Sequence, residues 1–131
     1  MQAQGLSEYK RIKQFVHDFA VHGGALGAVT LEGKLPDNAV ITSGMIEVIT
    51  AYTSTGSATV ALHTVGAGDI LGATAIASLS LAALVDVVPV GSAATAVKTA
   101  TAAGNSIIAT VATETITAGK MLITLEYFIG A

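Results

Sequence analysis

Short runs in which β-branched and small side chains alternate recur along this chain, and this period-two pattern constrains its fold more than any other feature. Successive side chains of a β-strand point to opposite faces of a sheet, so the alternation is typical of strands with one buried face. Turn-forming residues separate the runs at intervals of roughly ten residues, and strongly amphipathic helices are not evident. The pattern predicts an all-β fold with roughly seven to nine short strands, arranged as a single β-sandwich that is jelly-roll-like.

The clearest runs are predicted to pair as two hairpins. Residues 53–57, Thr-Ser-Thr-Gly-Ser, have the composition of a turn and would join a strand at 46–52 to a strand at 58–65. The second hairpin is predicted to turn at 117–120, Thr-Ala-Gly-Lys, between the last two runs of the chain. The β-branched content of all four runs fits a pleated, half-buried surface.

The remaining segments are shorter or less regular. Residues 26–31 are predicted to form a short strand, and 33–38 form a turn that contains a proline followed by Asp and Asn. Gly44 is expected to break or bulge the strand that begins at Ala39. Residues 73–84 are compatible with either a helix or a strand, and this alternative stays open. Two more short strands are predicted at 85–90 and 96–101.

The first 22 residues differ in character from the rest of the chain. They contain half of all the basic residues, whereas small residues dominate from Gly23 onward. Gly23 and Gly24 lack side chains and permit a turn or hinge between the two regions. The sequence therefore divides into residues 1–22, an N-terminal arm and edge strand, and residues 23–131, the jelly-roll-like β-sandwich domain.

The N-terminal region is expected to provide a contact element. Residues 1 to about 10 are predicted to be an extended, flexible arm, and 11–21 an edge strand with alternate side chains from Phe15 to Val21 on one side. A small basic group in this region is suited to an acidic protein surface, although it is equally typical of a solvated tail. The residues that we assign to partner contact are Tyr9, Lys10, Arg11 and Lys13.

The composition favours assembly with other subunits. The 131 residues fit one domain, and charged residues make up only 11% of the chain against roughly 25% in ordinary soluble domains. Small side chains bury little area, so a core built from them offsets the entropy of ordering the backbone only weakly. Burial against copies of the same chain or against a partner would add stability. The alternative is an ordinary monomer with an uncharged surface.

Several environments and partners are disfavoured. The longest strongly apolar uncharged run, residues 70–85, is shorter than the roughly 20 residues of a membrane-spanning helix and is interrupted by Gly, Thr and Ser. The N-terminus lacks the pattern of a secretory signal, and the absence of cysteine suits a reducing cytoplasm. The formal net charge is −3, which opposes binding to nucleic acid. We therefore expect neither a membrane nor a nucleic-acid partner.

The residues that carry chemistry form no recognisable catalytic or metal site. The histidines are His17, His22 and His63, and a Ser near His63 and Asp69 would be needed for a triad, which residue types alone do not indicate. The spacing of His17, Asp18 and His22 matches no zinc pattern. The glycines of 66–72 are one residue too widely spaced for a dinucleotide fingerprint and are expected to form a turn. The protein is predicted to be a non-enzyme without a cofactor or metal.

Four segments resemble a family of small structural proteins of tailed-phage virions. The chain reads LPDNAVIT at 35–42, TVAL at 59–62, PVGSAATAVKT at 89–99 and ITAGKMLITLEY at 116–127. Members of that family have similar strings at the entry to a strand, at the exit of a Ser/Thr/Gly-rich hairpin, in a middle segment and before a final strand. The resemblance covers roughly residues 20–128, in strings of low complexity.

The resemblance implies a function in the virion. Such proteins serve as head decoration or cement, as head fibres or as minor tail components, and they are commonly jelly-roll-like homotrimers on the capsid lattice. We expect a capsid decoration protein that assembles in the host cytoplasm, lies on the capsid exterior and binds the major capsid protein. A minor tail or head-fibre component is the first alternative. A carbohydrate-binding module is the second, with Tyr9, Tyr52 and Tyr127 as its tyrosines.

Overall fold

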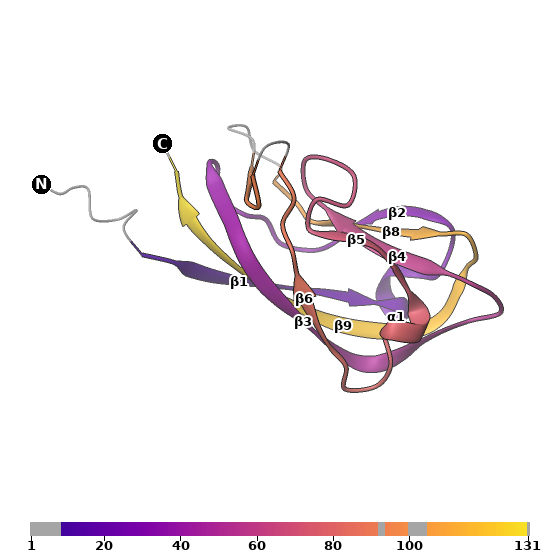
Figure 1. The fold of residues 1–131 in the computed structure, drawn as a ribbon. Helices are drawn as coiled ribbons and strands as arrows, with labels where there is room; N and C mark the ends of the chain where they lie inside the picture. The colour runs from indigo at the N-terminus through magenta and orange to yellow at the C-terminus, as the bar shows by residue number, and fades with distance from the viewer. Residues whose placement is uncertain (1–8, 92–93, 100–104, 131) are drawn as a thin grey trace, which may run out of the picture.

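The structure is a computed structural model that describes residues 9–91, 94–99 and 105–130 of the chain (Figure 1). The described residues build two antiparallel sheets, which we call sheet A and sheet B. Sheet A has the order β1 (Arg11–Asp18), β9 (Ile116–Ile129), β3 (Ala39–Ser54), β6 (Leu84–Val87), and the short β7 (Val97–Lys98) also pairs with β3. Sheet B has the order β2 (Gly27–Thr30), β8 (Ile108–Ala112), β4 (Thr59–His63), β5 (Leu71–Ala75).

The strand pairing is that of a jelly roll. When the two-residue β7 is set aside, the first strand pairs with the last, β1 with β9, and the second with the next to last, β2 with β8. The inner strands pair in the same nested way, β3 with β6 and β4 with β5. The chain thus forms one long folded-back ribbon that is rolled into two facing sheets. The predicted fold class, a jelly-roll-like β-sandwich, is confirmed.

Neither of the two predicted hairpins is present. β3 lies in sheet A and β4 in sheet B, so residues 55–58 carry the chain from one sheet to the other. Likewise β8 and β9 belong to different sheets, and residues 117–120 lie inside β9 instead of forming a turn. The chain turns earlier, at 113–115, where Thr113 has a φ of 75°. Alternation shows which face of a strand is buried but not which neighbouring strand it pairs with.

The predicted edge strand at 11–21 is correct for its first eight residues only. β1 is an edge of sheet A, but the chain becomes helical at α1 (Phe19–His22). The Asp18 carboxylate caps this helical turn by accepting a hydrogen bond of 2.9 Å from the amide of Ala20, and Gly23 ends it with a φ of 77°. The predicted arm at 1–8 lies outside the described residues.

The open segment 73–84 contains both kinds of structure. β5 ends at Ala75, a 3₁₀ turn, η2 (Ile76–Ser78), follows, and a turn with Ala82 at a φ of 65° leads into β6. The predicted strand at 85–90 is shorter than expected, because β6 ends at Val87 before Pro89. Of the predicted strand at 96–101, only β7 forms within the described residues.

Gly44 does not interrupt β3. The nearest register shift between β3 and β9 lies between Ile41 and Ser43, and pairing continues through Gly44. A Cβ at this glycine would lie 2.5 Å from the backbone oxygen of Thr124 on β9. The glycine therefore permits the close approach of two paired strands and does not form the bulge that the sequence suggested.

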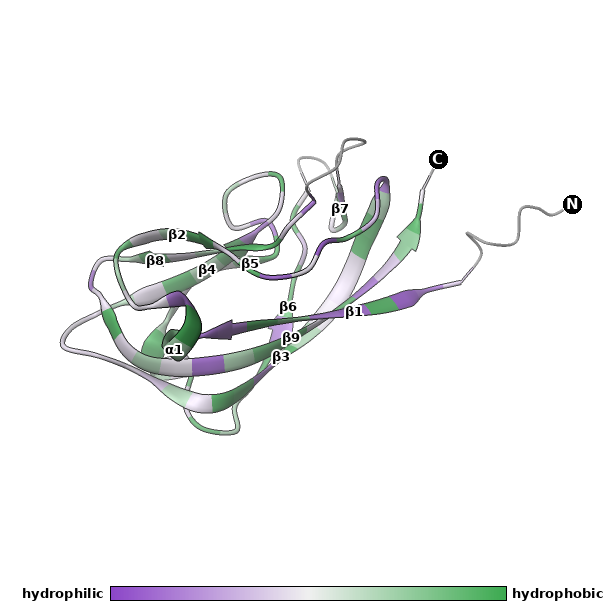
Figure 2. Cartoon of the chain, turned by 180° about the vertical axis from the view of Figure 1, so that it is seen from behind, coloured by the Kyte–Doolittle hydropathy of each residue, from purple (hydrophilic) through white to green (hydrophobic). Residues whose placement is uncertain are grey.

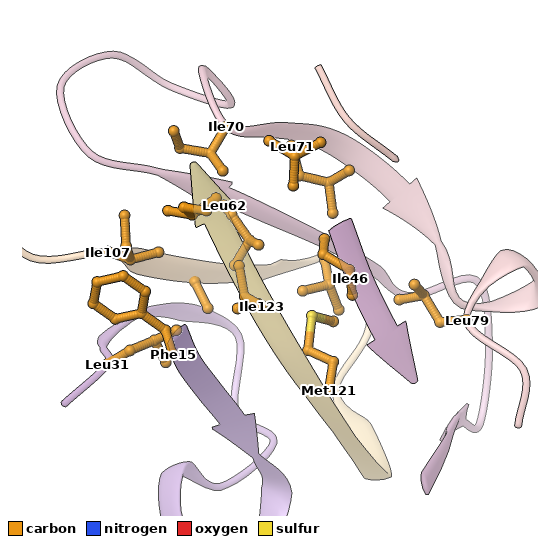
Figure 3. Packing of buried hydrophobic residues seen from close by; sticks show 14 of the residues in the cluster. Phe15, Leu31, Ile46, Leu62, Ile70, Leu71, Leu79, Ile107, Met121 and Ile123 are labelled. Carbon is orange, nitrogen blue, oxygen red and sulfur yellow. The ribbon is translucent and has the colours of Figure 1, made fainter. Parts of the chain in front are cut away.

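The core fills the space between the two sheets (Figure 3). Sheet A contributes Phe15, Ile46 and Ile123, and sheet B contributes Leu62, with Ile70 and Ile107 from the segments that flank the strands. The positions within the strands, Phe15, Ile46, Ile123 and Leu62, show the alternation seen in the sequence, since their neighbours along each strand are at least partly exposed. The helical segments α1 and η2, of four and three residues, are the helices of the described chain, and neither is long and apolar enough to cross a bilayer.

Candidate functional site

The strand β1 places the predicted contact residues at one margin of sheet A. Tyr9 is 57% exposed, and the guanidinium of Arg11 lies 5.6 Å from the centroid of its ring. Lys10 forms an ion pair of 3.6 Å with Glu126 on β9. The structure therefore brings Tyr9 and Arg11 together, while the alternation along β1 turns Lys10 to the opposite side from Arg11 and Lys13. Figure 2 shows hydrophilic and hydrophobic residues following one another along this strand.

The outer face of sheet A carries large apolar side chains in the open. Residues directly opposite in an antiparallel pair share a face, so the row Val16, Leu122, Glu47 and Leu84 crosses all four main strands on this side. Ile12 lies on the same side of β1. Ile12 is 63% exposed and Leu84 is 67% exposed. Exposed apolar side chains that gather on one sheet face mark an interaction surface. We call this surface the apolar face. Its exposed large hydrophobic residues are Ile12, Val16, Met45, Ile49 and Leu84.

Acidic side chains are interspersed in the apolar face. Glu47 stands opposite Leu84, and Asp86 stands opposite Met45. Glu126 accepts a hydrogen bond of 2.8 Å from the Ser43 hydroxyl and also pairs with Lys10. Lys10 and Lys120 lie on the same side and pair with Glu126 and Asp18, so Glu47 and Asp86 are the carboxylates that would complement a basic partner.

The outer face of sheet B has a different chemistry. No Asp, Glu, Lys or Arg occurs in β2, β4, β5 or β8, whereas every charged residue within a described strand belongs to sheet A. The outward row Ala28, Thr110 and Ala61 is typical of this face. Small and hydroxyl-bearing side chains therefore cover the outer face of sheet B, whereas large apolar and charged side chains are found on the outer face of sheet A.

A cluster of rings lies at the junction of β1 and α1, and sequence reasoning did not identify it. The His17 side chain is fully buried, and its ring lies nearly parallel to those of His22 and Tyr52, with centroid distances of 5.4 Å and 5.7 Å. Burial, ahead of charge repulsion from His22, lowers the pKa of His17 to about 4, although Asp18 opposes the shift. We call His17, His22 and Tyr52 the histidine cluster. The one signal in the sequence was that His17 shares the parity of the core residue Phe15.

The loop after β4 is organised by one carboxylate. Asp69, buried, accepts hydrogen bonds of 2.8–3.1 Å from the amides of Thr64, Val65 and Gly66. A pocket of about 610 Å³ lies between this loop and residues 90–91 and 94–98. Because the Asp69 carboxylate already holds three amides, its function is to cap the loop. The expected turn at 66–72 is present, with Gly68 at a φ of 67°.

The residue types considered for catalysis and metal binding do not converge in the described part of the chain. His63 lies on the outer side of β4, and the Asp69 carboxylate holds its own loop. His17 and His22 do come together, but the described residues contain no group of three His, Asp or Glu side chains placed to hold a metal ion. The candidate functional sites of the described residues are therefore the outer faces of the two sheets.

Comparisons with known proteins show which solved structures share this fold. No protein-family model matches the sequence, and no curated protein matches it. The structure is similar to a chain of the capsid asymmetric unit of cyanophage Pam1, with a TM-score of 0.64, 17% identity, and coverage of 99% of this chain and 93% of that chain. It is also similar to a chain of the acid-stable capsid of Helicobacter pylori bacteriophage KHP30, with a TM-score of 0.58, 16% identity, and coverage of 93% and 89%. At these identities the likeness establishes a shared fold that spans nearly the whole of each chain.

Proposed function

We propose that this protein is a structural component of a phage virion, which decorates the head and stabilises it by binding the lattice of the major capsid protein from outside. The observation that carries the proposal is the fold shared with a chain of a phage capsid over 99% of this protein and 93% of that chain. Because both lengths match so closely, the likeness is to an entire chain of a capsid and not to an inserted domain. A second phage capsid supplies a similar chain.

The apolar face provides the docking surface in this proposal. Ile12, Met45 and Leu84 leave apolar area exposed that a partner would remove from water, and burial of such area is the main favourable contribution to association. The acidic side chains among them select a capsid surface that carries basic residues. Of the predicted contact residues, Lys10 lies on the side of this face, whereas Arg11 and Lys13 project to the opposite side of the β1 edge. In this proposal Tyr9, Lys10, Arg11 and Lys13 make secondary contacts with the lattice around that edge.

The mechanism of stabilisation is mass action. A copy that binds the assembled shell but not the free capsid subunit adds its binding free energy to the stability of the shell. Many copies would multiply a modest contribution from each. We propose a homotrimer, which triples the docking area that one particle contributes at each site.

The proposal is tested by adding the purified protein to capsids that lack it and measuring occupancy by sedimentation and imaging. Leu84→Glu places a further charge on the apolar face and should reduce occupancy, while Ala61→Glu on the outer face of sheet B is the matched control. Equal loss with both variants would contradict the choice of face. Light scattering of the unbound protein should give three times the chain mass of 13.1 kDa, and a monomer would contradict the trimer.

Imaging of the parent particle separates the proposal from its alternatives. Density for the protein on the tail or on a fibre, and none on the head, would favour a minor tail or head-fibre component. No observation on the described residues favours a carbohydrate-binding module, because Tyr52 and Tyr127 are buried and Tyr9 alone remains as an exposed stacking platform.

A further inference from the structure

The histidine cluster joins the consecutive elements β1 and α1 to β3, which is distant from them in sequence. His17 is on β1, His22 on α1 and Tyr52 on β3, and their rings lie nearly parallel. The connection from β1 to β2, residues 19–26, leaves the sandwich at this cluster and crosses from sheet A to sheet B (Figure 2). Besides the cluster, two contacts of the described residues anchor this connection: the amide of Ile116 donates to the Gly24 oxygen at 3.0 Å, and Phe19 packs against the core.

The hydrogen bonds of the cluster fit neutral imidazoles. Nδ1 of His22 accepts a hydrogen bond of 3.1 Å from the amide of Asp18, so its Nε2 carries the proton that is donated to Glu32 at 2.9 Å. Nδ1 of His17 lies 2.6 Å from the Tyr52 phenol oxygen. Burial raises the pKa of Tyr52, so the phenol keeps its proton and donates it to this nitrogen. A proton on either Nδ1 would therefore face a donor.

Asp18 is the charged group that favours a positive charge on the His17 ring, and its effect is smaller than that of burial. Nε2 of His17, which carries the proton of the neutral ring when Nδ1 accepts from Tyr52, is buried and has no acceptor among the described residues, so a positive charge on the ring is not stabilised there. Two carboxylates lie near His17. Asp18, on the same strand, accepts a hydrogen bond from the Ala20 amide and lies 3.9 Å from Lys120 of β9. Glu32, which follows β2, accepts a hydrogen bond from His22. The element β3 contributes Tyr52, an uncharged phenol.

We propose that the histidine cluster is an acid-sensitive latch, which holds residues 19–26 against the sandwich while His17 is neutral and releases them when His17 is protonated, with both sheets still folded. Release would free the end of the edge strand β1 and the connection to β2. The device lies in the protein itself and does not depend on the proposed function in a virion.

The test is amide hydrogen exchange of the full-length protein between pH 7 and pH 4.5, with rates corrected for the intrinsic effect of pH. Protection of the amides at 20–25 should fall on acidification by roughly tenfold to a hundredfold relative to amides in the centre of β9. Protection that stays constant relative to β9 would overturn the latch. The His17 ring resonance, assigned by its absence from the spectrum of His17→Gln, should titrate together with the loss of protection.

Two variants and a control make the test specific. His17→Gln removes the titrating group and should abolish the pH dependence, whereas His63→Gln, on the outer side of β4, should leave it unchanged. If His17→Gln fails to fold, Tyr52→Phe serves instead: it removes the donor that favours neutral His17, so release should begin at a higher pH. A midpoint that is the same in Tyr52→Phe and in the unmodified protein would contradict the proposal.

Discussion

The phenol oxygen of Tyr52 lies 2.6 Å from Nδ1 of His17, although 35 residues separate the two along the chain. Both side chains are buried, and the contact connects the edge strand β1 to β3 across the intervening β9. A hydrogen bond between buried groups is costly to lose, because each partner left unpaired bears its full desolvation penalty. From this contact we expect the stability of one end of the sandwich to depend on the protonation state of His17.

The free energy of unfolding should fall as the pH drops from 6.5 towards 4. The folded protein binds a proton at His17 less readily than the unfolded chain does, since the pKa is lowered from 6.5 to about 4. The contribution of neutral His17 is therefore complete above pH 6.5 and is lost through this window, by about 3 kcal/mol at most. Urea unfolding at a series of pH values measures it. His17→Gln should flatten this part of the profile relative to His63→Gln, and identical profiles would contradict the assignment.

Truncation of Ile46 should destabilise the sandwich strongly. Its side chain is fully buried between the two sheets, so Ile46→Ala leaves a cavity that the facing side chains fill only in part. The expected loss is about 2–5 kcal/mol in the free energy of unfolding. Ile49→Ala, on the exposed side of the same strand, is the control and should change stability by less than about 1 kcal/mol. Similar losses at both positions would contradict the assignment of the buried face.

Replacement of Gly44 by alanine should also destabilise the protein. The added Cβ would lie 2.5 Å from the backbone oxygen of Thr124, which a strand in the middle of sheet A is poorly able to avoid. We expect a loss of about 1–3 kcal/mol. Gly72→Ala is the matched control, because its Cβ would meet nothing within 4 Å. Thermal unfolding of the two variants provides the comparison, and equal midpoints would refute the close approach.

Removal of the Asp69 carboxylate should loosen the loop after β4. Asp69→Ala leaves the amides of Thr64, Val65 and Gly66 without their common acceptor, at a cost of roughly 2–4 kcal/mol. Asp69→Asn retains one acceptor oxygen and should cost less. Hydrogen exchange at these three amides gives the readout, with Asp37→Ala, on an exposed residue, as the control substitution. Unchanged exchange in Asp69→Ala would show that the loop is held by other contacts.

The sequence by itself determined the class of the fold and the faces of most strands. Alternation at Ile46 and Val48, and again at Met121 and Ile123, is a local consequence of the pleat, so a strand reveals its buried side without knowledge of its neighbours. Local chemistry also decides where such a strand stops. The cap at Asp18 starts a helical turn and so ends β1 earlier than its periodicity suggested, and Gly23, with its positive φ, ends that turn. Both residues were visible in the sequence.

Only the tertiary structure decided which strands pair. Ser54 and Thr59 are close in sequence yet lie in opposite sheets, because the short turn between two strands permits either a hairpin or a crossing from sheet to sheet. The apolar face and the histidine cluster both follow from that pairing: Val16 meets Leu122, Glu47 meets Leu84, and His17 reaches Tyr52 only when β1, β9, β3 and β6 stand side by side. Surfaces and buried polar contacts depend on which strands become neighbours, and the energy that selects those neighbours is spread over the whole core.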